Sequence, residues 1–136
     1  MNNFIFENAT KVYFGKGCVK EYLSSMLLPY GDTVLFAYGG GSIKQNGIYD
    51  EVTALLKAAG KNIIEFTGIM ANPTYAKVME GAKLAREHHV DVILGIGGGS
   101  VMDCCKAVSL AARYDGDIWE EFWARPGFID FEPLPL

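Results

Sequence analysis

Cysteine, histidine and positive charge are scarce in this sequence of 136 residues, and each scarcity excludes a class of protein. The three cysteines are too few for a disulfide framework, so we expect reduced thiols and a cytoplasmic location. The two histidines, His88 and His89, are neighbours that point about 100° apart on a helix, so they cannot share one metal ion. We expect them at a solvated helix end, and we expect no metal site in this chain. The net charge of −4 leaves no basic stripe for a nucleic acid partner.

Long apolar runs are missing as well. No stretch approaches the roughly 20 apolar residues that span a membrane, and no signal peptide precedes the first polar residues, so we expect no membrane partner. What the sequence does have is 50% apolar and 21% charged residues, the balance of a globular protein. Residues 1–136 are therefore predicted to form a single domain with its own core.

The most informative stretch is 91–106, in which a glycine loop joins a strand to a helix. The apolar run Val92–Leu94 is typical of a strand buried on both faces. A helix is predicted from about Val101 to Ala112, with Ser100 as its N-cap. The loop between them consists of Gly97, Gly98, Gly99 and Ser100.

Such a loop favours phosphate binding, because backbone N–H groups and the positive end of the helix dipole converge where only glycine allows close approach. Asp103 follows Ser100 by three residues and can return a hydrogen bond to the cap or reach a ligand hydroxyl. The loop is neither the usual dinucleotide fingerprint, since Ser100 stands where a third glycine belongs, nor a Walker loop. The alternative is a glycine-rich turn that only reverses the chain.

A second glycine loop follows a second buried strand, which is predicted over 33–38. It consists of Gly39, Gly40, Gly41 and Ser42, with Lys44 close by. These residues offer N–H groups, a hydroxyl and a cation, whereas NAD sites hold a carboxylate here for the ribose 2′-hydroxyl. Donors suit a 2′-phosphate, so we predict a preference for NADP over NAD. The alternative is that Gly41 and Ser42 only cap the next helix and that Lys44 is solvated.

The rest of the chain alternates helices and strands. We predict helices over about 18–28, 47–59 and 74–89, a strand over 62–66, a β-hairpin over 3–14 and a short amphipathic helix over 119–123. This order indicates an α/β fold, a Rossmann-like parallel sheet with flanking helices and an N-terminal β-hairpin. Because ligands sit beyond the carboxyl ends of parallel strands, both glycine loops and the loop at Asn72 are expected to converge on one edge.

Together these segments resemble the iron-containing, metal-dependent alcohol dehydrogenases, and most strongly their NADPH-dependent butanol dehydrogenase branch. The resemblance rests on residues 2–17, on Tyr-Gly-Gly-Gly-Ser-Ile-Lys at 38–44, on Ala-Asn-Pro at 71–73 and on Gly-Gly-Gly-Ser-Val-Met-Asp at 97–103. It implies the nucleotide-binding half of an enzyme that transfers hydride between NADP and an alcohol or aldehyde such as butanol. Fe²⁺ or Zn²⁺ would be held by the other half.

The same resemblance assigns roles by position. It implies that Gly97–Ser100 hold the pyrophosphate and that Asp103 lies toward the nicotinamide. It implies that Asn72 faces the adenosine and that Gly39–Ser42 hold the 2′-phosphate. The family's metal ligands, one Asp and three His, have no counterpart here, so we expect no catalysis by this chain alone.

Three further expectations follow. The aromatic side chains of 119–123 favour a homo-oligomer if they form an exposed face. A cofactor domain of the NAD-dependent polyol or glycerol dehydrogenase type is an alternative, although such domains place an acid where Gly39–Gly41 stand. A non-catalytic nucleotide-binding or assembly module is the other alternative.

Overall fold

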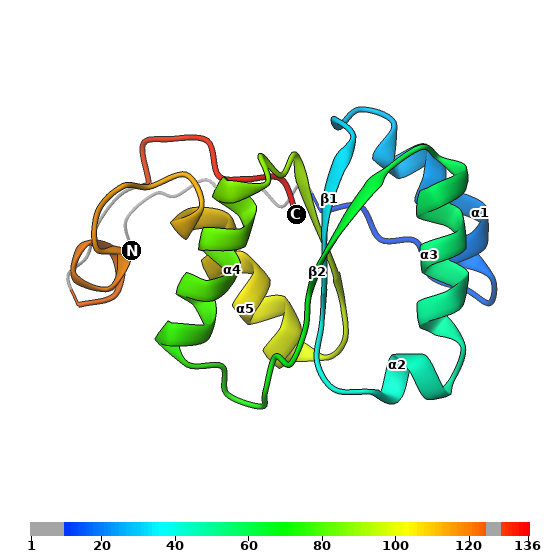
Figure 1. Ribbon diagram of the computed structural model, residues 1–136, viewed down its shortest axis with the longest axis horizontal. Coiled ribbons are helices and arrows are strands. Elements are labelled where there is room, and N and C mark those ends of the chain that lie inside the picture. Colours follow the sequence, from blue (N-terminus) through cyan, green and yellow to red (C-terminus); the bar gives the residue numbers. More distant parts are fainter. Residues whose placement is uncertain (1–9, 125–128) are drawn as a thin grey trace, which may run out of the picture.

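A parallel sheet lies at the centre of the molecule (Figure 1). The computed structural model describes residues 10–124 and 129–136. Within these ranges the strands β1 (Thr33–Tyr38), β2 (Asn62–Phe66) and β3 (Val92–Ile96) pair in the order β2-β1-β3. The carboxyl ends of all three strands lie at the lower edge of the sheet in Figure 1. The predicted α/β fold with a parallel sheet is therefore confirmed.

Helices cover both faces of this sheet. The helices α1 (Cys18–Leu27) and α3 (Ile48–Ala58) pack on one face, and α4 (Tyr75–Glu87) and α5 (Gly99–Ala111) pack on the other. The strand order explains this arrangement, because the crossovers from β1 to β2 and from β2 to β3 run in opposite directions. Right-handed crossovers then place their helices on opposite faces. The short helix α2 (Ser42–Gln45) and the π-helical turn η1 (Trp119–Trp123) complete the described elements.

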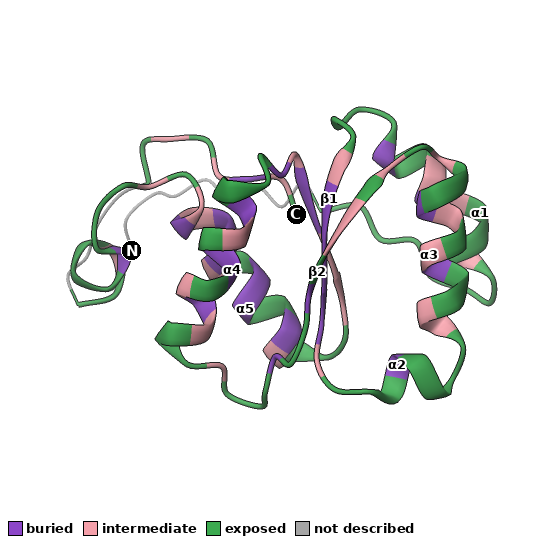
Figure 2. Cartoon of the chain, viewed as in Figure 1, coloured by how far each residue is buried: buried purple, intermediate pink, exposed green. Residues whose placement is uncertain are grey.

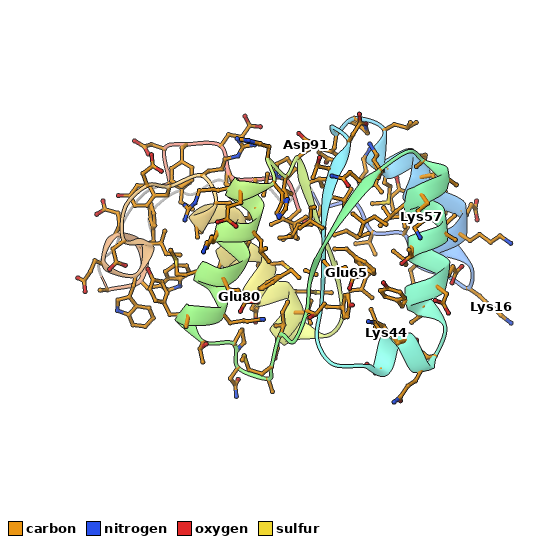
Figure 3. The ribbon with its side chains drawn as sticks, in the orientation of Figure 1. Lys16, Lys44, Lys57, Glu65, Glu80 and Asp91 are labelled. Atoms are coloured by element: carbon orange, nitrogen blue, oxygen red, sulfur yellow. The ribbon has the colours of Figure 1, made fainter. Side chains whose placement is uncertain are left out.

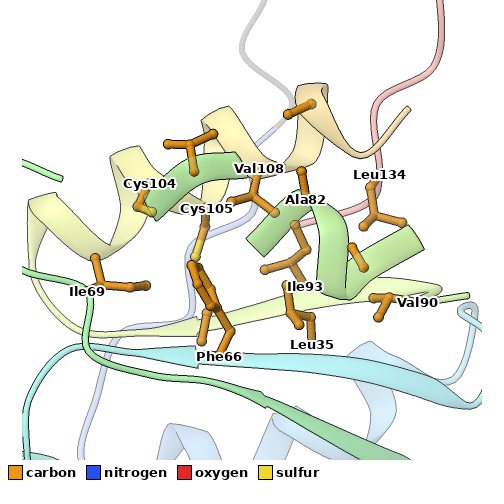
Figure 4. Packing of buried hydrophobic residues seen from close by; sticks show 14 of the residues in the cluster. Leu35, Phe66, Ile69, Ala82, Val90, Ile93, Cys104, Cys105, Val108 and Leu134 are labelled. Atoms are coloured by element: carbon orange, nitrogen blue, oxygen red, sulfur yellow. The ribbon is translucent and has the colours of Figure 1, made fainter. Parts of the chain in front are cut away.

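The alternation of side chains along β1 supplies two separate cores. Leu35 and Ala37 face α4 and α5, where they belong to the larger apolar cluster drawn in Figure 4. Val34 and Phe36 face α1 and α3 in the smaller cluster. Figure 2 shows the result, with β1 buried along most of its length and each long helix buried on its inner side only. This burial on both faces is what the apolar run of the sequence predicts.

The C-terminal segment 129–136 packs back onto α5 and β3. The Ser109 hydroxyl donates to the Leu134 carbonyl at 2.5 Å, and the Leu134 N–H donates to the Ser109 carbonyl at 3.0 Å. The Ile93 N–H of β3 donates to the Pro135 carbonyl at 2.8 Å. Leu134 itself is buried in the larger core. The segment thereby covers one end of α5 and the outer edge of β3.

The predicted N-terminal hairpin is the main departure from the expected elements. Residues 3–9 lie outside the described residues, and residues 10–14 form no strand, so the second half of the prediction is wrong. Val12 and Phe14 are 80% and 97% exposed, so their apolar alternation does not mark the buried face of a strand. Among the described residues, no helix combines the length and apolar character needed to cross a membrane.

Candidate functional site

The two glycine loops lie side by side at the carboxyl edge of the sheet. Tyr38 of β1 is in register with Ile96 of β3, so Gly39 and Gly97 leave the sheet next to each other. A Cβ placed on Gly39 would lie 3.8 Å from Val101 Cγ2, and one placed on Gly97 would lie 2.5 Å from the same atom. The loops therefore meet at the first turn of α5. The connections that follow β1 and β3 leave this edge toward opposite faces of the sheet. In open α/β sheets, ligands bind at such a point.

The glycines of the 97–100 loop serve different physical purposes. Gly97 allows α5 to pack against the strand, because a side chain there would collide with Val101. Gly98 has φ −85° and ψ −167°, a conformation open to any residue, and a Cβ there would meet nothing within 4 Å. A Cβ on Gly99 would also meet nothing within 4 Å. Neither backbone conformation nor packing requires glycine at 98 or 99, so the space above them is free for a ligand.

This space lies at the N-terminus of α5, a helix of 13 residues. Gly98 is its N-cap, no side chain caps it, and its first turn holds no acidic residue. The predicted cap at Ser100 is wrong, because the extended Gly98 lets the helix begin at Gly99 and places Ser100 within the first turn. The helix therefore presents the backbone N–H groups and positive dipole end of an anion site.

Asp103 does not return a hydrogen bond to this end of the helix. It is exposed and lies 3.5 Å from the Nζ of Lys106 on the next turn. It lines a pocket of about 280 Å³ together with Pro73, Trp119 and Trp123. Asn72, directly before Pro73, is exposed and has a left-handed backbone with φ 52°. Asp103 and the Asn72 loop thus neighbour each other, in a hollow separate from the one at Gly39–Gly41.

The 39–42 glycine loop borders another hollow, of about 330 Å³. Its lining residues are Tyr38, Gly39, Gly40, Gly41, Lys44, Glu65, Thr67 and Gly68. A Cβ on Gly40 or Gly41 would meet nothing within 4 Å. Ser42 is exposed and begins α2 directly after the loop. Lys44 faces the hollow as expected, with its Nζ 4.7 Å from the Tyr49 ring centre and 5.5 Å from that of Tyr38.

Glu65 is the residue of this hollow that the sequence interpretation missed. The hydroxyls of Tyr38 and Tyr49 donate to its two carboxylate oxygens at 2.6 and 2.5 Å. These two hydrogen bonds, Tyr38 first, and the nearby charge of Lys44 lower the pKa of Glu65. Burial and the same hydrogen bond raise the pKa of Tyr38. The signal in the sequence is an acid between the apolar residues Ile64 and Phe66 of the strand Asn-Ile-Ile-Glu-Phe.

The remaining candidates have structural roles. Cys104 and Cys105 are both buried in the larger core (Figure 4), and burial raises the pKa of Cys105 to about 12, so neither thiol is poised for reaction. His88 caps the end of α4, and both histidines are exposed there, as predicted. Across residues 10–124 and 129–136, no group of three or more His, Cys, Asp or Glu side chains could hold a metal ion.

The aromatic segment at the other hollow is partly exposed. Trp119 and Trp123 of η1 are 52% and 47% exposed, whereas Phe122 packs against Tyr114 and Phe131. Asp117, two residues before η1, accepts from the Trp119 N–H at 2.9 Å, and it also accepts from the Tyr75 hydroxyl at 2.9 Å. The Tyr75 hydrogen bond is the first cause of the lowered pKa of Asp117.

Comparison with known proteins identifies the relatives of this chain. The profile of the family described as iron-containing alcohol dehydrogenase matches residues 9–136. The chain is 49% identical over 122 residues to a Bacillus subtilis protein named "Probable NADH-dependent butanol dehydrogenase 2", covering 90% of this chain and 31% of that protein. It is 42% identical over 118 residues to the NADPH-dependent aldehyde reductase YqhD of Escherichia coli, covering 87% of this chain and 30% of that protein.

A solved structure agrees with these relatives. The NADH-dependent butanol dehydrogenase A of Thermotoga maritima superposes with a TM-score of 0.81 at 45% sequence identity, covering 90% of this chain and 31% of that one. The chain thus spans about a third of the length of the proteins it matches. The expected similarity to butanol dehydrogenases is confirmed, and the names of these relatives include both NADH-dependent and NADPH-dependent enzymes.

Proposed function

Because the chain belongs to the iron-containing alcohol dehydrogenase family, we propose that it is the domain that binds the nicotinamide dinucleotide in such an enzyme. The whole enzyme would transfer hydride between this cofactor and a primary alcohol or aldehyde such as butanol. The observation that carries the proposal is the open space over Gly98 and Gly99 at the N-terminus of α5. Neither glycine is needed for folding, so a bound phosphate is the physical reason for their presence.

The cofactor would be held at two places by residues of this chain. The pyrophosphate would lie on Gly97–Ser100, where the N–H groups of α5 point, and the adenosine ribose would lie at Gly39–Ser42. Asp103 would lie toward the nicotinamide and Asn72 would face the adenosine. Asp103 and Pro73, the residue after Asn72, line the same hollow beside α4 and α5. When bound, the nicotinamide supplies the hydride acceptor and donor. The contribution of this chain is to bind and orient it.

We further propose that the cofactor is NADP. The hollow at Gly39–Gly41 offers open backbone and the ammonium of Lys44, both suited to a 2′-phosphate. The carboxylate of Glu65 in the same hollow favours NAD instead, as do the relatives named NADH-dependent. NAD is therefore the second candidate. The absence of an acid at 39–41 still argues against the polyol dehydrogenase type of site.

The metal of the family is a different matter. The described residues include no group able to hold Fe²⁺ or Zn²⁺, so they do not fit the ion. We therefore assign no catalytic residue here, and the chain alone is expected to be inactive. A nucleotide-binding module without catalysis is the remaining alternative for the isolated chain. We also propose a cytoplasmic homo-oligomer, on the strength of the buried free thiols and of the exposed Trp119 and Trp123.

Calorimetry with NADPH and NADH tests the cofactor assignment. Ser42→Asp should weaken NADPH binding more than NADH binding, by roughly 1–3 kcal/mol, because it adds a like charge and removes a donor. Asp50→Ser, on the exposed first turn of α3, is the matched control and should leave the ratio of the two affinities unchanged. An unchanged ratio in the Ser42 variant would refute the 2′-phosphate seat. Absence of any binding to the unmodified chain would refute the cofactor domain.

A further inference from the structure

Glu65 is placed to accept hydrogen bonds from a ligand as well as from neighbouring side chains. It is the residue before the last of β2 and lies on the α3 side of the sheet, between the sheet and α3 in Figure 3. A carboxylate offers about four acceptor positions, and the hydroxyls of Tyr38 and Tyr49 take two of them. Glu65 remains exposed and lines the hollow at Gly39–Gly41. Unused acceptor capacity therefore remains at this hollow.

Lys44 brings the opposite charge to the same hollow. Its ammonium lies over the rings of Tyr49 and Tyr38, the two residues whose hydroxyls donate to Glu65. Figure 3 shows Lys44 and Glu65 on the same side of the sheet, near α3. The tyrosines thus fix an anion with their hydroxyls and a cation with their ring faces. A ligand in the hollow lies near both the Lys44 ammonium and the Glu65 carboxylate. An anionic group on the ligand is attracted by the first and repelled by the second.

We propose that Glu65 is a specificity-determining residue of this hollow, which accepts from a ribose 2′-hydroxyl and repels a 2′-phosphate. The inference rests on the proposed cofactor site and adds to it a residue that opposes binding of the 2′-phosphate. Lys44 and the glycine N–H groups favour the phosphate, and Glu65 limits that preference. Discrimination between two ligands commonly combines an attractive and a repulsive element in this way.

The size of the effect follows from the charges. A unit negative charge about 6 Å from a phosphate dianion in a water-like dielectric weakens binding about tenfold. The loss of a hydrogen bond from the 2′-hydroxyl acts in the opposite direction on the unphosphorylated ligand. Neutralising Glu65 should therefore raise the affinity for the phosphorylated ligand relative to the other by about tenfold or more.

Two small nucleotides isolate this half of the cofactor. The affinities of 2′,5′-ADP and 5′-AMP for the full chain are measured by calorimetry, and their ratio is the readout. Glu65→Gln keeps the shape and an acceptor for the tyrosines, and Glu65→Thr is a second neutral variant that suits a strand. Glu65→Asp keeps the charge. Glu80→Gln is the matched control, because Glu80 is an exposed acid of α4 on the other side of the sheet.

The neutral variants should shift the ratio toward 2′,5′-ADP by about tenfold, while Glu65→Asp and Glu80→Gln should stay within about twofold of the unmodified chain. A folded neutral variant with an unchanged ratio would overturn the role of Glu65 and leave the cofactor site standing. An equal shift in Glu80→Gln would overturn it as well, because the effect would then be one of net charge. If the unmodified chain binds neither nucleotide, the proposed function itself fails.

Discussion

Replacing Gly98 with valine separates binding from folding in this chain. Gly98 adopts φ −85° and ψ −167°, which β-branched residues adopt readily, and a Cβ there would meet no atom within 4 Å. Because valine is a poorer N-cap than glycine, the free energy of unfolding should fall by no more than about 1 kcal/mol. The valine side chain would nevertheless occupy the space in which we place the pyrophosphate.

The expected loss of affinity is large. A phosphate on the end of α5 would lose about two charge-assisted hydrogen bonds to backbone N–H groups, each worth roughly 1.5–3 kcal/mol. The sum, roughly 3–6 kcal/mol, corresponds to a hundredfold or greater loss in affinity for NADPH. Calorimetry measures this loss, and thermal unfolding followed by circular dichroism measures the stability of the same variant.

Gly97→Ala is the matched control, because its Cβ would lie 2.5 Å from Val101 Cγ2. This collision should lower the free energy of unfolding by about 1–3 kcal/mol. A Gly98 variant that binds NADPH as the unmodified chain does would refute the phosphate site. A Gly98 variant destabilised as much as the Gly97 variant would refute the conclusion that the space above Gly98 is free.

Two further predictions concern assembly and acid stability. The exposed Trp119 and Trp123 should make the chain a dimer or larger species in sedimentation experiments, and Trp123→Asp should shift it toward monomer; a monomeric unmodified chain would contradict this. Because the folded-state pKa of Glu65 is lowered, its hydrogen bonds with Tyr38 and Tyr49 stabilise the fold above the unfolded pKa of about 4.5, and this stabilisation is lost as pH falls through the folded value. Thermal unfolding between about pH 6 and pH 3 should thus show a smaller loss of stability for Glu65→Gln, and parallel curves for the two proteins would contradict the argument.

The sequence was sufficient to predict the placement of the two glycine loops. The apolar runs at 33–38 and 92–94 indicated the two strands that precede the loops, and parallel pairing brings their carboxyl ends to one edge whatever the details of packing. The structure accordingly sets Gly39 beside Gly97 at Val101. This part of the site depends on the order and direction of the strands, which the pattern of apolar residues predicts well.

The features that escaped prediction have different physical causes. Ser100 has the chemistry of an N-cap, but the backbone of Gly98 decides where α5 starts. Glu65 was treated as one residue of a strand, because nothing local shows that Tyr38 and Tyr49 will meet it from β1 and α3. The hairpin over 3–14 was predicted from local alternation, and residues 10–14 form no strand. Tertiary partners decided the case of Glu65, whereas the local backbone of Gly98 decided that of Ser100.

The segment that crosses β3 affects how the chain meets other chains. An edge strand presents unpaired backbone groups that can recruit a strand from another molecule, the first step of edge-to-edge aggregation. In this chain Pro135 accepts the Ile93 N–H, so part of that edge is already occupied. Proline has no N–H, and both Pro133 and Pro135 lie in the covering segment, so it offers few donors to a further strand. The proline-containing segment beside β3 thus hinders the addition of a further strand at that side of the sheet.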